Sequence, residues 1–127
     1  MLTGFHHIAI ICSEIKRSRA FYADLLGLPV LAEAYRAERQ SWKIDLGLPC
    51  GGQIELFSFV GAPARLSRPE AQGLRHLAFS VADVSSATHW LEEQGIAVEP
   101  VRLDETTGRR FTFFADPDGL PLELYEA

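Results

Sequence analysis

The 127-residue chain repeats itself. When His7 is laid on His76, a glycine follows at nearly the same distance in both halves, 20 and 19 residues on. The same overlay places Glu55 on Glu123, which stand 48 and 47 residues after the two histidines. Short sequence segments agree as well: HHIAI is similar to RHLAF, and QIELF is similar to PLELY. Such a repeat predicts two similar modules whose incomplete sheets complete each other's core.

Both halves predict the same order of elements, β-α-β-β-β. In each half an apolar strand precedes a run with helical spacing, which begins at a capping residue, Ser13 or Asp83, and ends at a glycine, Gly27 or Gly95. Three extended runs follow each helix. The predicted strands are 5–11, 30–36, 41–48 and 52–59 in the first half, and 74–81, 96–103, 110–115 and 120–126 in the second.

The expected fold class is α+β, with two tandem β-α-β-β-β modules forming a curved mixed sheet around a cleft. Module one covers 4–59 and module two covers 74–127. The segment 60–73, rich in Pro, Ala and Gly, is predicted to link them. We expect a single domain over 1–127, since this length suits one ordinary globular domain.

Charge and composition restrict the partners. The chain is 47% hydrophobic, which disfavours disorder. Its formal net charge of −5 disfavours nucleic acid and anionic membranes as partners. Neither a signal peptide nor a run of transmembrane length is apparent, so a cytoplasmic protein with a small-molecule substrate is expected. Cys12 and Cys50 lack metal-site spacing and are expected to be reduced thiols. Two groups of arginines are candidates to hold a small anion: Arg65, Arg68 and Arg75, and Arg102, Arg109 and Arg110.

Two adjacent histidines open the first strand, and strand alternation separates them. Successive side chains of a strand point to opposite faces. Ile8 and Ile10 share the apolar face expected to pack on the helix, so His7 points away from it. His6 falls on the apolar side or at the strand's edge. In module two the same alternation places His76 on the face opposite the helix.

Four residues occupy symmetric positions: His7, Glu55, His76 and Glu123. Both glutamates are flanked by apolar residues, and an ionised carboxylate in such a run is costly to bury unless it is paired or bound to a cation. Imidazoles and carboxylates together suit a divalent transition metal. Any one of the four taken alone would more often be structural. The prediction of a metal site therefore depends on two His–Glu sets at nearly equal spacing.

The words HHIAI, IELF, GLRHLAFSV and DPDGLPLELYE together resemble the vicinal-oxygen-chelate superfamily of glyoxalases, bleomycin-resistance proteins and dioxygenases. The resemblance covers essentially the whole chain. Its most specific motif is DPDG followed four residues later by a glutamate, Glu123. The words SWKIDL and RFTFF are most similar to small bacterial glyoxalase-I-like (lactoylglutathione-lyase-like) proteins.

This resemblance implies a lyase or isomerase that holds one divalent metal ion per site, with Ni, Co or Zn favoured and Mn or Fe as alternatives. His, Glu, His, Glu is the ligand pattern of glyoxalase I, so His7, Glu55, His76 and Glu123 would be the ligands. The implied substrate is a hemithioacetal or a related α-hydroxycarbonyl. The implied reaction is proton transfer through a metal-bound enediolate, with Glu123 as the base and Glu55 as a possible second base. A homodimer is expected, while pairing of the modules within one chain or between two chains stays open.

Other functions remain as alternatives. The same platform serves epimerases, thiol transferases and dioxygenases, and the fold also occurs in proteins that only bind a small molecule. Extradiol dioxygenases typically have no ligand at the position of Glu55, and the epimerase usually has Gln there. Bleomycin-binding proteins lack the ligands altogether. The four ligands therefore favour a metalloenzyme of the glyoxalase I type over a non-catalytic binding protein.

The expected apolar wall of a substrate pocket comes from three aromatic residues. Phe57 and Phe59 share a strand face with Glu55, and Tyr125 shares one with Glu123. Packing in the core is an equally good explanation for them.

The charged part of a substrate pocket is less defined. Lys43, Arg39 and Arg110 are candidates for an anionic group, with a solvated surface position as the alternative. Glutathione-dependent glyoxalase I has Arg and Asn where this chain has Ile11 and Phe59, so the identity of the thiol stays open. The segment 35–46 is interpreted as a lid, a subunit contact or a charged edge strand.

Overall fold

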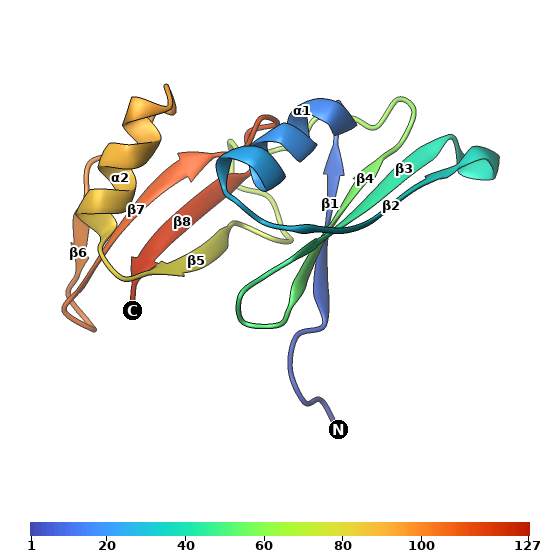
Figure 1. Cartoon of the computed structure of the whole chain (residues 1–127). Helices are drawn as coiled ribbons and strands as arrows, with labels where there is room; N and C mark the ends of the chain where they lie inside the picture. The colour runs from blue at the N-terminus through green and yellow to red at the C-terminus, as the bar shows by residue number, and fades with distance from the viewer. The chain divides into compact units, whose positions relative to one another are not determined.

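The computed structural model describes all residues, 1–127, and shows two compact units, Met1–Ala64 and Arg65–Ala127 (Figure 1). Each unit is one β-α-β-β-β module with a four-stranded mixed sheet. The α+β class and the internal repeat are therefore confirmed. The boundary between the units falls inside 60–73, so residues 65–73 of the predicted linker belong to the second unit.

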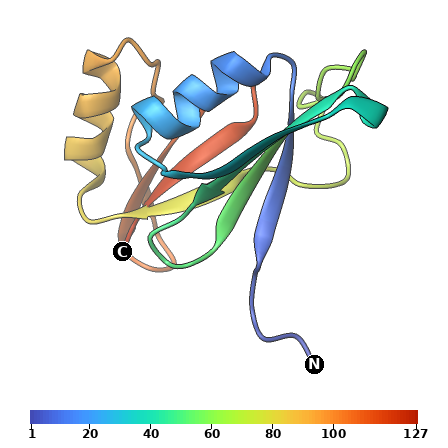
Figure 2. The ribbon, with the colours of Figure 1, turned by 45° about the vertical axis from the view of Figure 1, so that its right-hand side comes forward.

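The first unit forms a sheet of order β1-β4-β3-β2. Strands β1 and β4 are parallel, and the other neighbours are antiparallel. Helix α1 packs against β4 and continues directly into the π-helical η1, and Figure 2 shows both on one side of the sheet. The bounds are β1 His7–Cys12, α1 Ile15–Arg19, η1 Ala20–Leu25, β2 Val30–Arg36, the 3-10 turn η2 Ala37–Arg39, β3 Ser41–Gly47 and β4 Gln53–Ser58.

The core of this unit lies between the helix and one face of the sheet. Tyr22, Leu46, Ile54 and Leu56 are almost completely buried. The prediction of Ser13 as the N-cap was wrong by one residue, because the N-cap position falls on Glu14, which makes no side-chain capping bond. Helix ends commonly shift by a residue or two, since several conformations satisfy the first N–H groups.

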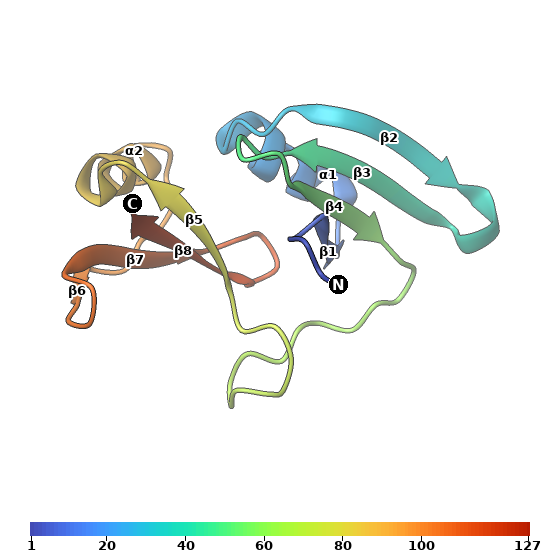
Figure 3. The ribbon, with the colours of Figure 1, turned by 90° about the horizontal axis from the view of Figure 1, so that it is seen from below.

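The second unit repeats the arrangement with the sheet order β5-β8-β7-β6. Strands β5 and β8 are parallel, and the remaining pairs are antiparallel. Helix α2 packs against β7 and β8 and lies beside the sheet in Figure 3. The bounds are β5 Leu77–Val81, α2 Val84–Glu93, β6 Arg102–Asp104, β7 Arg109–Ala115 and β8 Pro121–Glu126.

Asp83 caps α2 as predicted. Its carboxylate accepts hydrogen bonds from the backbone N–H groups of Ser85 (2.9 Å) and Ser86 (3.3 Å). The N–H and hydroxyl of Ser86 lower the pKa of Asp83, since both bonds favour the ionised form.

The extended run predicted over 96–103 is only partly a strand, because β6 begins at Arg102. Pro100 has no N–H for a sheet ladder and restricts the backbone before it. The chain is still held to the sheet next to it, where the N–H of Glu99 donates to the carbonyl of Phe113 at 2.9 Å. A predicted strand is thus replaced by an irregular segment anchored on β7.

Neither cysteine forms a disulfide: Cys12 is buried and Cys50 is exposed. None of the helices is long and apolar enough to cross a membrane.

Candidate functional site

The first half of the candidate site lies on the sheet of unit 1, on the face away from its core. The register of the parallel pair β1–β4 places Ala9 opposite Glu55 and His7 two residues earlier on the same face. His7 Nδ1 is 3.5 Å from a Glu55 carboxylate oxygen. The Glu55 side chain is only 12% exposed, while that of His7 is 40% exposed. The predicted orientation of His7, opposite Ile8 and Ile10, is confirmed by the burial of β1.

A lysine accompanies this first pair. Lys43 Nζ is 3.8 Å from Glu55 and 2.6 Å from Asp45. Because β3 pairs with β4 so that Asp45 lies opposite Glu55, the ammonium group sits between two carboxylates of the same sheet face. Lys43, predicted as a substrate residue, thus lies beside Glu55.

The second half of the candidate site pairs the equivalent histidine and glutamate in unit 2. His76 Nε2 is 3.0 Å from Glu123 Oε2, and the Glu123 side chain is again only 12% exposed. Here no lysine or arginine forms an ion pair with the carboxylate, so the imidazole is its one charged or polar partner at ion-pair distance. His76 itself lies 3.1 Å, Nδ1 to Nη1, from Arg75.

The DPDG turn positions Glu123. Asp116 is 5% exposed, and its carboxylate accepts from the N–H groups of Asp118 and Leu120, both at 2.9 Å. Gly119 adopts a φ of +82°, a left-handed conformation that favours glycine. The turn sets Ala115 opposite Pro121, which puts Glu123 opposite Phe113. A slip of one residue would point Glu123 into the core, so the turn and the site are coupled.

We therefore expect Asp116→Ala to destabilise unit 2. The substitution leaves two buried or half-buried N–H groups without their acceptor, which costs about 1–3 kcal/mol in the free energy of unfolding. Urea denaturation monitored by circular dichroism measures the change. Glu105→Ala, in the exposed turn between β6 and β7, is the control and should change stability little. Equal stability of the two variants would contradict this role of the turn.

The donor atoms fit a divalent transition metal by type. Each unit supplies one imidazole and one largely buried carboxylate, the combination of nitrogen and oxygen ligands that suits such ions. Neither unit by itself gathers three or more potential ligands. The combination of the two pairs into one four-ligand set stays a prediction from the sequence.

The aromatic residues predicted as a pocket wall lie on the faces of the two glutamates. Phe57 stacks on Phe59, with ring centroids 5.9 Å apart, and the Arg36 guanidinium lies 5.0 Å from the Phe57 centroid. Phe57 is half-buried and Phe59 is exposed, and both lie away from the buried core of unit 1.

Tyr125 lies on the corresponding face of unit 2, stacked on Phe111. Its hydroxyl donates to Asp104 at 2.8 Å and also bonds Thr107. The Tyr125 hydroxyl, together with the N–H of Thr106, lowers the pKa of Asp104. Tyr125 thus ties β8 to the β6–β7 turn as well as presenting its ring.

Arg110 is a correction to the sequence-based assignment. Its guanidinium pairs with Glu126 at 2.8 Å and donates to Ser85 Oγ at 2.9 Å, next to the start of α2. In β7 it alternates with Phe111 and therefore lies on the helix-bearing face, opposite to Glu123. Arg110 is a structural ion-pair residue in this fold. Arg39 lies in η2 and is exposed.

The structure adds two neighbours of His76 that the sequence reasoning did not assign to the site. The Phe113 ring meets the imidazole edge to face at 5.0 Å, and Arg75 bonds its Nδ1. Both follow from strand position: Phe113 pairs with Glu123, and Arg75 directly precedes His76. In the segment RFTFF, side chains alternate between the two faces of the strand. This alternation, with Phe111 and Phe113 on one face and Thr112 on the other, could have indicated Phe113 from the sequence.

Comparison with known proteins agrees with this architecture. YwkD of Bacillus subtilis strain 168, an uncharacterized protein, is 57% identical over 126 residues, which cover 99% of this chain and 98% of that protein. The glutathione transferase FosA of Serratia marcescens is 29% identical over 127 residues, covering 98% and 82%. The crystal structure of a glyoxalase family protein from Enterococcus faecalis superposes with a TM-score of 0.90 at 48% identity, covering 97% of each chain.

Residues 4–124 match the model of one family, and the two β-α-β-β-β units, the paired His–Glu positions and the DPDG turn are the features through which the sequence resembled it. The chain belongs to the Glyoxalase/Bleomycin resistance protein/Dioxygenase superfamily.

Proposed function

We propose that this protein is a metal-dependent lyase or isomerase of the glyoxalase I type. Its substrate is a hemithioacetal or a related α-hydroxycarbonyl compound, in which a proton moves between neighbouring carbons. The observation that carries the proposal is a histidine beside a largely buried glutamate at equivalent positions of both units, at 3.5 Å through His7 Nδ1 and at 3.0 Å through His76 Nε2. Both glutamate side chains are only 12% exposed, and a carboxylate at such a position needs a paired group or a cation.

The metal would be held by His7 and Glu55 from one module and by His76 and Glu123 from another. The second module belongs to the same chain or to the second copy of a homodimer. Nickel, cobalt and zinc are the favoured ions, with manganese and iron as alternatives. When bound, the ion supplies Lewis-acid stabilisation of the negative charge that develops on the substrate's oxygens.

Glu123 is the better placed of the two carboxylates for proton transfer. Glu55 already forms an ion pair with the ammonium group of Lys43, at 3.8 Å, in addition to its contact with His7. Glu123 has only the imidazole of His76 at ion-pair distance. In the proposed reaction Glu123 accepts the proton from one substrate carbon and returns it to the neighbouring carbon.

The aromatic residues beside the two pairs would limit the access of water to a bound substrate. Phe57 and Phe59 stand on the Glu55 face, and Phe113 and Tyr125 on the Glu123 face. Exclusion of water strengthens the electrostatic interactions of the carboxylates and protects a reactive carbanion from solvent protons.

A second candidate is transfer of a thiol to a small electrophile. The 29% identity to FosA, whose name describes a glutathione transferase, favours this reaction class. It uses the same metal ligands, but it needs no carboxylate that both removes and returns a proton. The two functions therefore differ in the role of Glu123.

Metal content is the first test. We expect the purified protein to hold about one divalent ion per pair of modules, to lose it on chelation and to regain it on reloading, as measured by elemental analysis. Glu123→Gln should weaken metal binding by at least about 10-fold, because removal of a charged ligand costs no less than removal of a group that only orients a ligand. Glu92→Gln, on the exposed face of α2, is the matched control. A folded protein that never retains metal would refute the proposal.

A further inference from the structure

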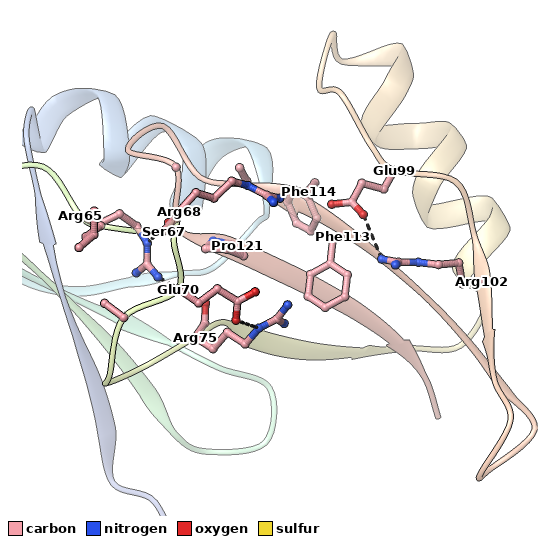
Figure 4. Close-up of a pocket in the computed structure, with 14 residues that line it drawn as sticks. Arg65, Ser67, Arg68, Glu70, Arg75, Glu99, Arg102, Phe113, Phe114 and Pro121 are labelled. Atoms are coloured by element: carbon pink, nitrogen blue, oxygen red, sulfur yellow. Dashed lines mark hydrogen bonds and ion pairs between the residues drawn. The ribbon is translucent and has the colours of Figure 1, made fainter.

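Unit 2 contains a cavity of about 430 Å³ with arginines along its wall (Figure 4). It lies between the segment 65–75, which precedes β5, and residues of β7. A cavity of this size suits a small-molecule ligand. Its charged and aromatic lining consists of Arg65, Arg68, Arg75, Arg102, Glu70, Glu99 and Phe113.

The charge of the pocket is opposite to that of the chain. Four arginines and two glutamates give the lining a formal charge of +2, whereas the whole chain carries −5. Four of the chain's twelve Lys and Arg residues line this one cavity. Such a concentration of one sign of charge in a concave site attracts ligands of the other sign.

Much of this positive charge is available to a ligand. Arg75 pairs with Glu70 and Arg102 with Glu99, both at 3.0 Å, but all four side chains are at least half exposed. Exposed ion pairs contribute little, so an incoming anion competes with them readily. Arg68 forms no salt bridge and its side chain is exposed. Arg75 is the main cause of the lowered pKa of Glu70, and the charge of Arg68 helps to lower it at longer range.

Phe113 connects the pocket to the His76–Glu123 pair. Its ring lies between two guanidinium groups, 6.0 Å from Arg75 and 5.5 Å from Arg102, as Figure 4 shows. The same ring contacts the imidazole of His76. Arg75 also bonds His76 directly, at 3.1 Å. A ligand in this pocket would therefore lie next to one half of the candidate metal site.

We propose that this arginine pocket binds a doubly charged oxyanion of the phosphomonoester type, carried by a small molecule. Planar guanidinium groups match the oxygen edges of such a group with paired hydrogen bonds, and a dianion gains more from several arginines than a single carboxylate does. The pocket's own binding is independent of the metal. The bound molecule would be the substrate, with its anionic group in this pocket and its reactive carbons at His76 and Glu123. This second step rests on the proposed function.

The test uses inorganic phosphate as the probe and acetate as the singly charged comparison. The anion is titrated into metal-free full-length protein at low ionic strength, and the arginine side-chain and backbone NMR signals are followed. We expect saturable shifts centred on Arg68, Arg75 and Arg102 with phosphate, and weaker binding of acetate.

Two substitutions should act in opposite directions. Arg68→Gln removes the pocket arginine that forms no salt bridge and should weaken phosphate binding about tenfold. Glu70→Gln removes the carboxylate that competes with phosphate for Arg75 and should tighten phosphate binding several-fold. Arg109→Gln and Glu105→Gln are the matched controls, because they change the charge of unit 2 by the same amounts as Arg68→Gln and Glu70→Gln. Neither residue lines the pocket, so both substitutions should leave the affinity for phosphate nearly unchanged.

The outcomes separate this inference from the proposed function. Non-saturable phosphate shifts, or an Arg68→Gln affinity equal to that of Arg109→Gln, would overturn the pocket even if the protein loads metal normally. Saturable binding that responds to Arg68 and Glu70 as expected would support it even if no metal is retained. Glu123→Gln, which removes a negative charge beside His76, should not weaken phosphate binding.

Discussion

Glu123→Gln is expected to lower the rate of the proton-transfer step by about 10²- to 10⁴-fold, the contribution of a positioned general base. The amide is nearly the same size as the carboxylate but cannot accept the proton. Glu123 is held on β8 opposite Phe113, so its position survives the substitution. The loss should appear in kcat measured at saturating metal, because metal affinity also falls.

The measurement uses hemithioacetals formed from methylglyoxal and a panel of thiols, since Ile11 and Phe59 leave the thiol undetermined. Exchange of the substrate's carbon-bound hydrogen with deuterated solvent, followed by NMR, reports the proton transfer itself. Glu55→Gln provides the comparison: because the proposed reaction assigns the proton transfer to Glu123, the loss of rate in Glu55→Gln should be smaller. An unchanged rate in metal-loaded Glu123→Gln would favour thiol transfer or another reaction in which this carboxylate is only a ligand.

Removal of either histidine is expected to abolish metal retention. His7→Gln and His76→Gln each delete one of the four proposed ligands, and we expect each to lower metal affinity at least about 100-fold while the protein stays folded. The imidazoles are 40% and 28% exposed, so neither contributes to the core. Calorimetric metal titration measures the loss, with His89→Gln, on the exposed side of α2, as the control.

Mixing these two inactive variants tests how the modules pair. If a site combines module one of one chain with module two of its partner, a mixed dimer has one intact site and one doubly defective site. Metal binding and activity should then return to about a quarter of the wild-type level after subunit exchange, since half of the dimers are mixed. No recovery after proven exchange would place all four ligands within one chain. Loss of metal from only one variant would contradict a site shared by the two modules.

The orientation of the metal-ligand candidates was predictable from sequence because it depends on local rules. Strand alternation places His7 opposite Ile8 and Ile10, and the burial of β1 agrees. The Asp83 cap was readable for the same reason, since it involves only the next three residues. Ser13 was misassigned because neighbouring residues compete for the N-cap position with little difference in free energy.

The faces of Arg110 and Phe113 required the sheet register. The position of Glu123 defines which face of β8 carries the candidate site. Because Phe113 pairs with Glu123, Phe113 lies on that same face of the sheet, and Arg110 lies on the opposite face, beside the helix. The arginine pocket likewise needed the fold, because Arg68 and Arg102 are brought to one cavity by the path of a loop that has no periodic pattern.

The sequence by itself determined the repeat, the α+β class and the faces of His7 and Glu123 on their strands, because periodicity and spacing express which side chains must be buried. Only the tertiary structure decided the His–Glu distances, the partners of Arg110 and the cavity beside His76. Those features depend on contacts between residues far apart in the chain, which arise from strand register and loop path rather than from local preference.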